Sequence, residues 1–171
     1  WAEAMELYRN AFPYKERRSE EEHLRALHDP QFVADGIWRD GELAGILYYW
    51  KTGDWYYIEH LAISPALRGQ QTGSAALASF CRGKQVVLEI DPPVDDISIR
   101  RLHFYQRLGF VRNPQEYLHP SFREPFETHQ LVLMSYPRLL TNDEARNFAD
   151  FVREEVLRYS GHERPILPKL P

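Results

Sequence analysis

Apolar residues recur every three to four positions at the start of the chain and every second position soon afterwards. The first pattern predicts a helix over residues 1–12, which Pro13 ends because proline cannot continue a helix. It predicts a second helix from Ser19, where a serine before three glutamates is typical of a capping box, to Asp29-Pro30. The turn between them, residues 12–18, is either a plain charged connection or part of a binding site.

Strand patterns fill the next part of the chain. Residues 32–39 and 42–50 flank Asp40-Gly41, and an Asp-Gly pair between strand-like runs predicts a hairpin because both central turn positions tolerate positive φ. A further turn leads into a third strand over residues 55–63. The pattern therefore predicts three antiparallel strands in succession.

Helix and strand patterns then alternate. After a polar loop, residues 75–82 are apolar at helical spacing, and residues 85–90 read as a short buried strand. Asp95-Asp96 offers an N-cap for a further helix over residues 97–108. Because a helix joins the strand over residues 55–63 to the one over 85–90, these two strands are expected to run parallel.

The last third of the chain begins with a short strand over residues 110–112. Residues 113–127 contain three prolines and no periodic pattern, and a loop this long is usually functional or mobile, so we expect a lid or binding loop. Residues 128–136 form the last expected strand. A capped helix begins at Thr141 and ends near Gly161, and its apolar face must be covered by its own domain or by a second subunit.

The composition fits one packed domain. A chain of 171 residues can bury roughly two-thirds of its unfolded surface. The formal net charge of −4 argues against nucleic acid as the main partner, and no apolar run approaches the roughly 20 residues that cross a membrane. No signal-peptide pattern opens the chain, and the single cysteine, Cys81, cannot form an internal disulfide. We therefore expect a cytoplasmic protein. The sequence contains no H-E-x-x-H motif and no paired cysteines at the spacing of metal ligands, so we expect no metal site.

The stretch from Ile58 to Phe80 carries the most chemical information. A strand stops at Ser64-Pro65, passes through the polar loop Arg68-Gly69-Gln70-Gln71-Thr72-Gly73, and restarts as a helix. This order places free backbone N–H groups at a helix N-terminus, where the helix dipole also favours an anion. A phosphate or pyrophosphate is therefore the expected ligand.

The same stretch resembles a known family. Leu61-Ala62-Ile63-Ser64-Pro65, followed by Arg68-Gly69-Gln70-Gln71-Thr72-Gly73, resembles the central signature of the GNAT superfamily of acyl-CoA-dependent N-acetyltransferases. In that signature a strand ends in L-A-V/I-x-P, R-G-x-G-x-G follows, and a helix of small residues comes next. Gln71 stands where the family usually has its first motif glycine. A frame shifted by two, from Gln70 to Ala75, also fits the looser family pattern Q/R-x-x-G-x-G/A.

A second phrase supports the resemblance. Residues 98–110 resemble N-x-x-A-x-x-F-Y-x-K-x-G-F, a later helix-and-strand element of the family. Phe104-Tyr105 and Gly109-Phe110 match this pattern at the right separation. Ser98 replaces the usual Asn, and Arg101 replaces the usual Ala.

The resemblance implies an α/β fold of GNAT type. It would be a single domain over residues 1–171, with a mixed, mostly antiparallel central sheet flanked by helices and a C-terminal helical extension over residues 138–171. The sheet would splay at its two parallel central strands, where acetyl-CoA enters. The family normally has a strand before its first helix, and this chain opens on helix with Trp1, so we expect that strand upstream of the given sequence.

The resemblance also implies acetyl-CoA as co-substrate and a set of residues that hold it. The loop would bind the pyrophosphate through backbone N–H groups, and Arg68 would supply a counter-charge. The backbone of Leu61 to Ile63 would pair with the pantetheine arm, and one of its N–H groups would polarise the thioester carbonyl. The expected cofactor-binding residues are Leu61, Ala62, Ile63, Arg68, Gly69, Gln70, Gln71, Thr72, Gly73, Ser74 and Ser98.

Acetyl transfer from a thioester to an amine also needs groups that move protons. Tyr105 matches the family position whose phenol protonates the departing thiolate. Related enzymes often place a carboxylate that takes the amine proton where Glu59 stands. A solvated strand carboxylate is the other interpretation of Glu59, and Glu89 is an alternative base. His60 would point to the opposite sheet face from Glu59. His119 is a weaker candidate.

The function that the resemblance implies is acetyl transfer from acetyl-CoA to a primary amine by direct attack in a ternary complex. The acceptor, a small-molecule or peptide amine, stays open, as do another acyl donor such as succinyl-CoA and the choice between monomer and homodimer. The alternative is a catalytically silent CoA-binding or sensory module of the same fold. Gln71 in place of glycine favours that alternative, and Tyr105 opposes it.

Overall fold

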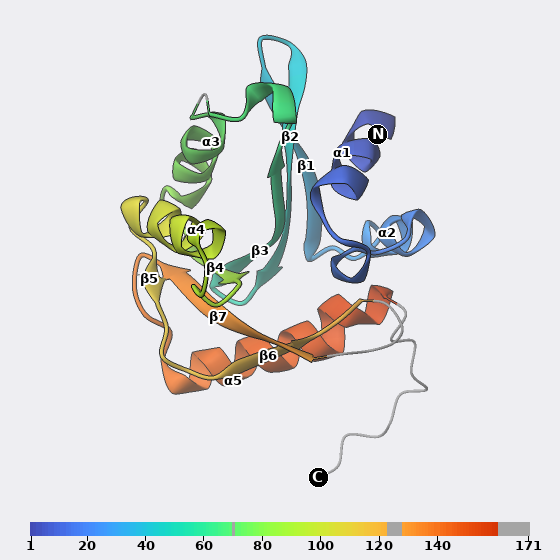
Figure 1. Ribbon diagram of the computed structural model, residues 1–171. Helices are drawn as coiled ribbons and strands as arrows, with labels where there is room; N and C mark the ends of the chain where they lie inside the picture. The colour runs from blue at the N-terminus through green and yellow to red at the C-terminus, as the bar shows by residue number, and fades with distance from the viewer. Residues whose placement is uncertain (70, 123–127, 161–171) are drawn as a thin grey trace.

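A mixed sheet with helices on both faces organises the protein (Figure 1). The computed structural model describes residues 1–69, 71–122 and 128–160. Within them the strands follow the spatial order β1-β2-β3-β4-β7-β5, with β6 also pairing with β7, and only β3 and β4 run parallel. The strands are β1 (Phe32–Arg39), β2 (Glu42–Thr52), β3 (Trp55–Ile63), β4 (Gln85–Ile90), β5 (Val111–Arg112), β6 (Tyr117–Pro120) and β7 (Thr128–Tyr136). The predicted fold class is confirmed.

Two groups of helices cover the two faces of the sheet. Those on one face are α1 (Ala2–Ala11), α2 (Glu20–Ala26) and α5 (Asn142–Phe151), and those on the other are α3 (Thr72–Cys81) and α4 (Asp96–Arg107) (Figure 1). Side-chain caps begin α2, α4 and α5 at Ser19, Asp95 and Thr141, as the sequence predicts. Helix α3 begins at Thr72, ahead of the predicted Ala75. No helix in the described ranges is long and apolar enough to cross a membrane.

The predicted β1–β2 hairpin is confirmed, and its turn has the expected backbone. Asp40 and Gly41 adopt φ values of 51° and 79°. Strand β2 then pairs with β3, but the register shifts where Tyr48 pairs with His60 and Tyr49 with Ile58. Glu59 is the extra residue of this β-bulge, which interrupts the regular alternation of side chains between the two faces.

The prediction of an unstructured loop over residues 113–127 is wrong for its middle part. Strand β6 pairs antiparallel with β7 from Tyr117↔Leu131 to Pro120↔Thr128. Its alternation covers only four residues and ends in a proline, so periodicity does not reveal it. Because Tyr117, His119 and Phe122 are buried, this part of the segment belongs to the packed structure. Residues 123–127 lie outside the described part of the chain.

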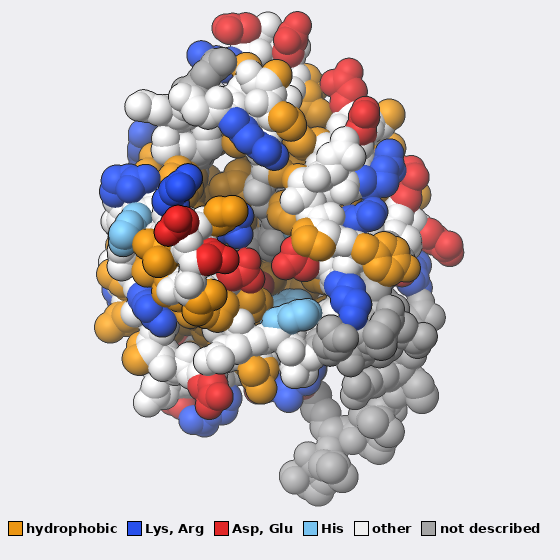
Figure 2. All heavy atoms as spheres, viewed as in Figure 1, with side chains coloured by type: hydrophobic (Ala, Val, Ile, Leu, Met, Phe, Trp, Pro, Cys, Tyr) orange, Lys and Arg blue, Asp and Glu red, His pale blue; other side chains and the backbone are white. Residues whose placement is uncertain are grey.

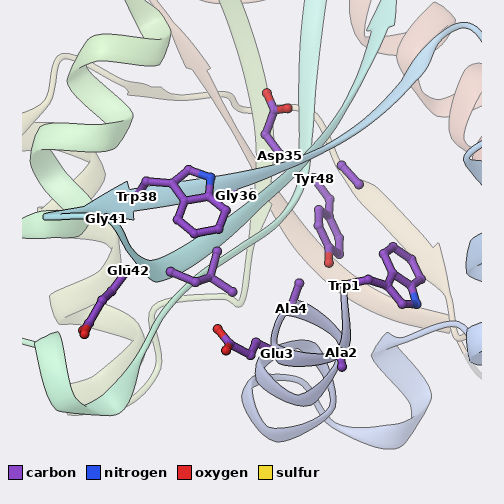
Figure 3. A pocket seen from close by; sticks show the side chains of 12 residues that line it. Trp1, Ala2, Glu3, Ala4, Asp35, Gly36, Trp38, Gly41, Glu42 and Tyr48 are labelled. Atoms are coloured by element: carbon purple, nitrogen blue, oxygen red, sulfur yellow. The ribbon is translucent and has the colours of Figure 1, made fainter.

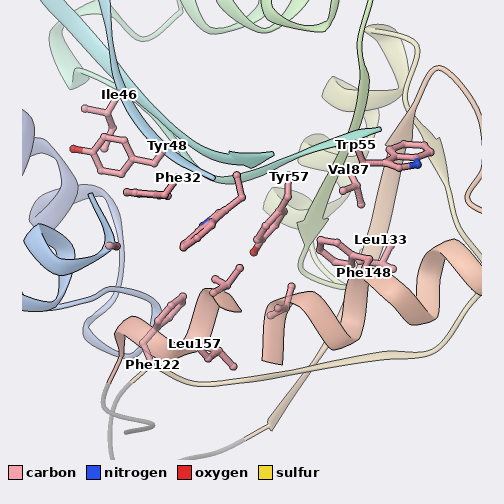
Figure 4. Packing of buried hydrophobic residues seen from close by; sticks show 14 of the residues in the cluster. Phe32, Ile46, Tyr48, Trp55, Tyr57, Val87, Phe122, Leu133, Phe148 and Leu157 are labelled. Carbon is pink, nitrogen blue, oxygen red and sulfur yellow. The ribbon is translucent and has the colours of Figure 1, made fainter. Parts of the chain in front are cut away.

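The C-terminal segment covers a face of its own domain. Helix α5 continues through a π-helical turn, Val152–Val156, and a 3₁₀ turn ending at Tyr159. Phe148 packs edge-on against Tyr57 of β3, with ring centroids 4.9 Å apart (Figure 4). Of the two alternatives left open for the apolar face of this helix, the structure therefore shows the first. Its predicted end near Gly161 lies outside the described residues.

Candidate active site

The two parallel strands separate partway along the sheet. Strands β3 and β4 pair only from Trp55↔Gln85 to Ile58↔Leu88, although β3 continues to Ile63. Beyond Ile58, the backbone of β3 therefore has no strand partner on its β4 side among the described residues. Figure 2 shows a hollow over this part of the sheet, with acidic side chains along its edge. Backbone N–H and C=O groups in such an opening are available to an extended ligand.

The polar loop after β3 connects this strand to the start of α3. Gln71 is the N-cap of α3 and adopts the left-handed conformation, with φ 59° and ψ 16°, but its side chain forms no capping bond. The hydroxyl of Ser74 donates to the Gln71 carbonyl at 3.1 Å. Without a side-chain cap, the first N–H groups of α3 are left for an anion. Gln70, one of the predicted cofactor-binding residues, lies outside the described residues.

Close backbone packing holds this loop against the sheet. A Cβ atom on Gly73 would lie 3.3 Å from the Ile63 side chain, so α3 approaches β3 closely at this point. A Cβ atom on Gly45 of β2 would lie only 2.4 Å from the carbonyl oxygen of Ala62. Two glycines thus let β2, β3 and α3 meet around the predicted pantetheine-binding residues Ala62 and Ile63.

Two arginines lie beside the loop. Arg68 is exposed, and its Nε donates to the Ile63 carbonyl at 3.3 Å. Arg39, at the end of β1, donates from Nη1 to the Thr72 hydroxyl at 3.0 Å. Arg39 could not be predicted from sequence, because only the fold brings the β1–β2 hairpin to the start of α3. Both cations can balance the charge of a phosphate group.

Tyr105 lies on α4, on the sheet face that α3 and α4 cover. Its ring packs 5.2 Å from Phe104 and 5.6 Å from Phe110, measured between centroids. Burial raises the pKa of Tyr105, and the charge of Arg101 lowers it in part. The phenol is therefore protonated at neutral pH, as a proton donor must be.

Ser98 caps the same helix. Its backbone N–H donates to Asp95 Oδ1 at 2.8 Å, and its hydroxyl accepts from the backbone N–H groups of Val94 and Asp95 at 3.0 and 3.1 Å. The side chain is buried within this capping box. Its contacts therefore stabilise α4, and its predicted contact with the cofactor stays a prediction.

Glu59 lies at the bulge of β3 with both carboxylate oxygens occupied. Oε1 accepts from Arg18 Nη1 at 2.5 Å, and Oε2 accepts from the Trp50 indole. Burial by itself raises the pKa of Glu59. The charges of Arg18 and His60 and these two hydrogen bonds lower it, and together they outweigh burial, so the pKa lies below its ordinary value. The role of Glu59 as base stays a prediction.

His60 and Glu59 share a sheet face. The expectation that they point to opposite faces is wrong, because the bulge inserts a residue and breaks the two-residue period. His60 Nδ1 lies 3.7 Å from Glu59 Oε1, and its Nε2 lies 2.8 Å from the Glu16 carbonyl oxygen. Burial lowers the pKa of His60 to about 4, so the ring is neutral at pH 7.

Glu89, the alternative base, lies on β4 where the two parallel strands separate. The Tyr57 hydroxyl donates to its Oε1, and His119 Nε2 of β6 lies 3.6 Å from its Oε2. The side chain of Glu89 is 10% exposed, compared with 2% for Glu59. Burial and the charge of Glu89 raise the pKa of Tyr57 well above its ordinary value, so this phenol stays a donor.

The turn between α1 and α2 contains Glu16, whose pKa is changed by charged groups on other elements. Burial raises the pKa of Glu16 in this turn, and the charge of Asp91, just after β4, raises it further. The charges of His129, Arg101 and His119 lower it. Charged groups on α4, β6 and β7 and at the end of β4 thus act on Glu16. Of these segments, the sequence indicates only the turn and residues 113–127 as candidate binding segments.

A separate cavity of about 820 Å³ lies between α1 and the outer strands β1 and β2 (Figure 3). Trp1, Asp35, Trp38 and Tyr48 are among its lining residues. None of the predicted cofactor-binding or catalytic residues lines it. It is therefore distinct from the opening between β3 and β4.

Comparisons with known proteins agree with this arrangement. The model of the Acetyltransferase (GNAT) family matches residues 1–110. No curated protein sequence matches the chain. A solved structure from Bacteroides thetaiotaomicron, assigned to the GNAT family of acetyltransferases, is 31% identical with a TM-score of 0.84, covering 91% of this chain and 90% of that one.

More distant structures share the fold. A Bacillus subtilis acetyltransferase in complex with CoA is 17% identical, with a TM-score of 0.55, and the match covers 79% of this chain and 91% of that one. The ribosomal-protein-S18-alanine N-acetyltransferase of Escherichia coli is 18% identical, with a TM-score of 0.56 and coverage of 83% and 89%. The match to the family model, which spans more than half of the sequence, and the 31% identity to the Bacteroides structure together show that this chain belongs to the GNAT family of acetyltransferases.

Proposed function

We propose that the protein transfers an acetyl group from acetyl-CoA to a primary amine, by direct attack while both substrates are bound. The observation that carries this proposal is the opening between β3 and β4, which lies next to the uncapped start of α3. An extended arm and an anionic group, joined in one molecule, match these two features. Family membership supports the same chemistry.

The chain offers donors for each part of acetyl-CoA. The N–H groups at the start of α3, together with Arg68 and Arg39, would hold phosphate groups. The backbone of Leu61 to Ile63, on the side that β4 does not reach, would bond the pantetheine amides, and one of its N–H groups would stabilise the negative charge on the thioester oxygen. Gln71 does not prevent this, because it adopts the backbone conformation that glycine would supply.

Protons must leave the amine and reach the sulfur. An ammonium group first loses one proton to a base, the neutral nitrogen attacks the carbonyl carbon, and the C–S bond then breaks. Tyr105 would give its proton to the departing thiolate, and the second proton lost by the amine nitrogen restores the phenol through solvent. One carboxylate would take the first proton, and the two candidates are Glu59 and Glu89.

Acidic groups favour an acceptor that arrives as a cation. The charge of Asp91 acts on Glu16, and His119, which also acts on Glu16, lies 3.6 Å from Glu89. A protonated amine approaching these carboxylates is attracted before it is deprotonated. This supports a primary amine as acceptor and leaves its remaining structure open.

The direct test combines binding and turnover. Calorimetric titration with acetyl-CoA and CoA should show binding of both, and thiol release should depend on an added amine from a panel of small amines and peptides. Binding without release for any amine would instead support a silent CoA-binding module. No binding of either ligand would contradict the proposal.

Tyr105→Phe tests the proton donor. We expect kcat to fall roughly 10²-fold or more while the Kd for CoA stays within about twofold, because only the proton transfer is lost. Tyr56→Phe, which changes a partly buried tyrosine of β3 on the same sheet face, is the matched control and should retain activity. Equal losses of kcat and CoA affinity in Tyr105→Phe would contradict the role of acid.

A further inference from the structure

Arg18 is a fully buried arginine in the turn between α1 and α2. Arg18 as a whole is 1% exposed, and its guanidinium reaches two distant segments. Nη1 donates to Glu59 Oε1 at 2.5 Å, and Nη2 donates to the carbonyl oxygen of Val156 at 2.7 Å. Its backbone N–H donates to the Tyr8 hydroxyl at 2.8 Å. The Arg18 side chain thus joins three segments that lie far apart in sequence: its own turn, β3 at Glu59 and the C-terminal segment at Val156.

Each of these three segments has an irregular backbone at the contact. Glu59 is the bulged residue of β3, and Val156 ends the π-helical turn that follows α5. Arg18 lies outside both neighbouring helices. Bulges and π-turns leave backbone or side-chain groups without regular partners, and the guanidinium supplies partners to both. The Phe122 ring lies 5.0 Å from the guanidinium carbon.

The pair is unsuited to proton exchange with a substrate. The Glu59 side chain is 2% exposed and that of Arg18 is 0% exposed. Each oxygen of Glu59 already accepts a hydrogen bond, from Arg18 or from Trp50. Protonating Glu59 would leave the guanidinium as an uncompensated buried charge, which is strongly unfavourable.

We propose that Arg18 and Glu59 are a positioning pair that fixes the bulge of β3 and ties it to the C-terminal segment, and that Glu59 does not take the amine proton. This inference rests on the proposed function, because the strand it positions is the one expected to bind acetyl-CoA. The bulge directly precedes Leu61 to Ile63. A slip of one residue there would turn the open backbone groups and every following side chain away from the ligand.

The discriminating experiment compares Glu59→Gln with the double variant Arg18→Met/Glu59→Gln. In the single variant the guanidinium loses its counter-charge, so we expect a melting temperature lower by roughly 10 °C and a kcat lower by roughly 10²-fold. The double variant removes both charges, and methionine keeps most of the length of the arginine stem. We expect it to melt well above the single variant and to regain kcat to within about tenfold of wild type.

The pH profile separates positioning from catalysis. If Glu59 only positions the strand, the acid limb of kcat/KM in the double variant stays at the wild-type pH. The other titratable groups around Glu59, which must be considered in fitting this limb, are Tyr8, Arg18, His23, Tyr57 and His60. A folded double variant with kcat more than tenfold below wild type and a displaced or lost acid limb would overturn the proposal.

Binding measurements keep the test independent of turnover. The Kd for acetyl-CoA should rise in Glu59→Gln and return toward the wild-type value in the double variant. The same Kd in all three proteins would overturn the positioning role, even if no amine is ever acetylated. If Glu59→Gln does not fold, the double variant against wild type decides the question alone.

A surface ion pair provides the matched control. Asp143 and Arg146 of α5 form an exposed pair at 3.6 Å, with side chains 84% and 71% exposed. Asp143→Asn/Arg146→Met should leave the melting temperature, the Kd for acetyl-CoA and the pH profile unchanged, because exposed pairs contribute little. A recovery in the Arg18 double variant is then specific to the buried pair.

Discussion

Two buried histidines should make the folding stability of the protein sensitive to mild acid. His23 of α2 is fully buried among aromatic rings, and neither ring nitrogen has a hydrogen-bond partner in the described residues. Burial, together with the charge of Arg18, lowers the pKa of His23 to about 4, and burial lowers that of His60 to about the same value. An unfolded chain would protonate both rings near pH 6.5.

Folding stability should therefore fall as the pH drops from about 6.5 toward 4, because the unfolded state binds protons that the folded state excludes. His23→Leu removes one of these groups and one unpartnered buried polar ring. We expect the free energy of unfolding to rise by about 1 kcal/mol at pH 7.5. The loss between pH 7.5 and 5 should shrink by about 2 kcal/mol.

Urea unfolding at both pH values measures this effect. His28→Leu, at an exposed position after α2, is the control and should leave the pH dependence unchanged. A His23→Leu protein that loses as much stability as wild type between pH 7.5 and 5 would show that His23 is not a source of the acid sensitivity.

Gln71 shows how a substitution can keep the backbone of a motif. Its left-handed conformation costs a non-glycine residue about 1–2 kcal/mol. Gln71→Gly relieves that cost but adds freedom to the unfolded chain, so we expect stability to stay level or rise by up to about 1 kcal/mol. CoA affinity should be retained.

The control for Gln71 is a glutamine with helical backbone. Gln106→Gly, on the exposed surface of α4, should lower stability by about 0.5–1 kcal/mol. Chemical denaturation of both variants decides the matter. Similar losses at the two positions would mean that Gln71 is not strained.

Sequence patterns located single residues well where the backbone was regular. The motif residues Arg68, Gly69 and Gln71 lie at the start of α3 as expected. The positions of Glu59 and His60 relative to the sheet could not be predicted, because a bulge has no signature in the alternation. Arg18 reads as part of a charged turn, and only packing from a segment near residue 156 makes it a buried residue.

At the scale of elements, the contact between β2 and β3 depends on Gly45. Gly45→Ala would place a Cβ atom 2.4 Å from the Ala62 carbonyl oxygen, so the two backbones must move apart. We expect a loss of about 2–3 kcal/mol in stability and weaker acetyl-CoA binding, because the displaced strand is the one proposed to bind it.

Gly36→Ala in β1 is the matched control for that change. Its added Cβ atom would meet only side-chain atoms of Leu43 and Trp38, at 2.9 Å, and these can rotate away. Its cost should be below about 1 kcal/mol. Thermal melts and CoA titrations of both variants provide the comparison, and equal losses would argue against a special role for the β2–β3 approach.

Elements with strong local signals were predicted, and those that depend on distant partners were not. Strands β1, β2 and β3 and the capped starts of α2 and α5 have such signals in turns and caps. Strand β6 does not, since four residues with a proline become a strand only when β7 lies beside them. The presence and type of an element with local signals could therefore be predicted, whereas an element that forms only through its pairing with another strand could not.

At the scale of the whole molecule, two hydrophobic cores lie on opposite faces of one sheet. The larger includes Phe148 and Leu157 of the C-terminal segment, so this segment is part of the packed domain (Figure 4). Motif resemblance, more than periodicity, predicted the mixed sheet and the place where it opens. The ionisable groups that act on Glu16 and Glu89 come from the C-terminal end of β4 and from α4, β6 and β7, and no local pattern brings these together.

The short parallel seam between β3 and β4 has a kinetic consequence. Only four residue pairs join the two strands, from Trp55↔Gln85 to Ile58↔Leu88. Beyond them, alternate amides of β3 face no partner strand in the part of the chain that the structure describes. These amides should exchange their hydrogens with solvent rapidly, although they lie in the middle of a sheet. Occupation of the opening by acetyl-CoA would slow that exchange at residues 59–63 and leave the outer strand β1 unchanged, so deuterium uptake would map the cofactor path without any turnover.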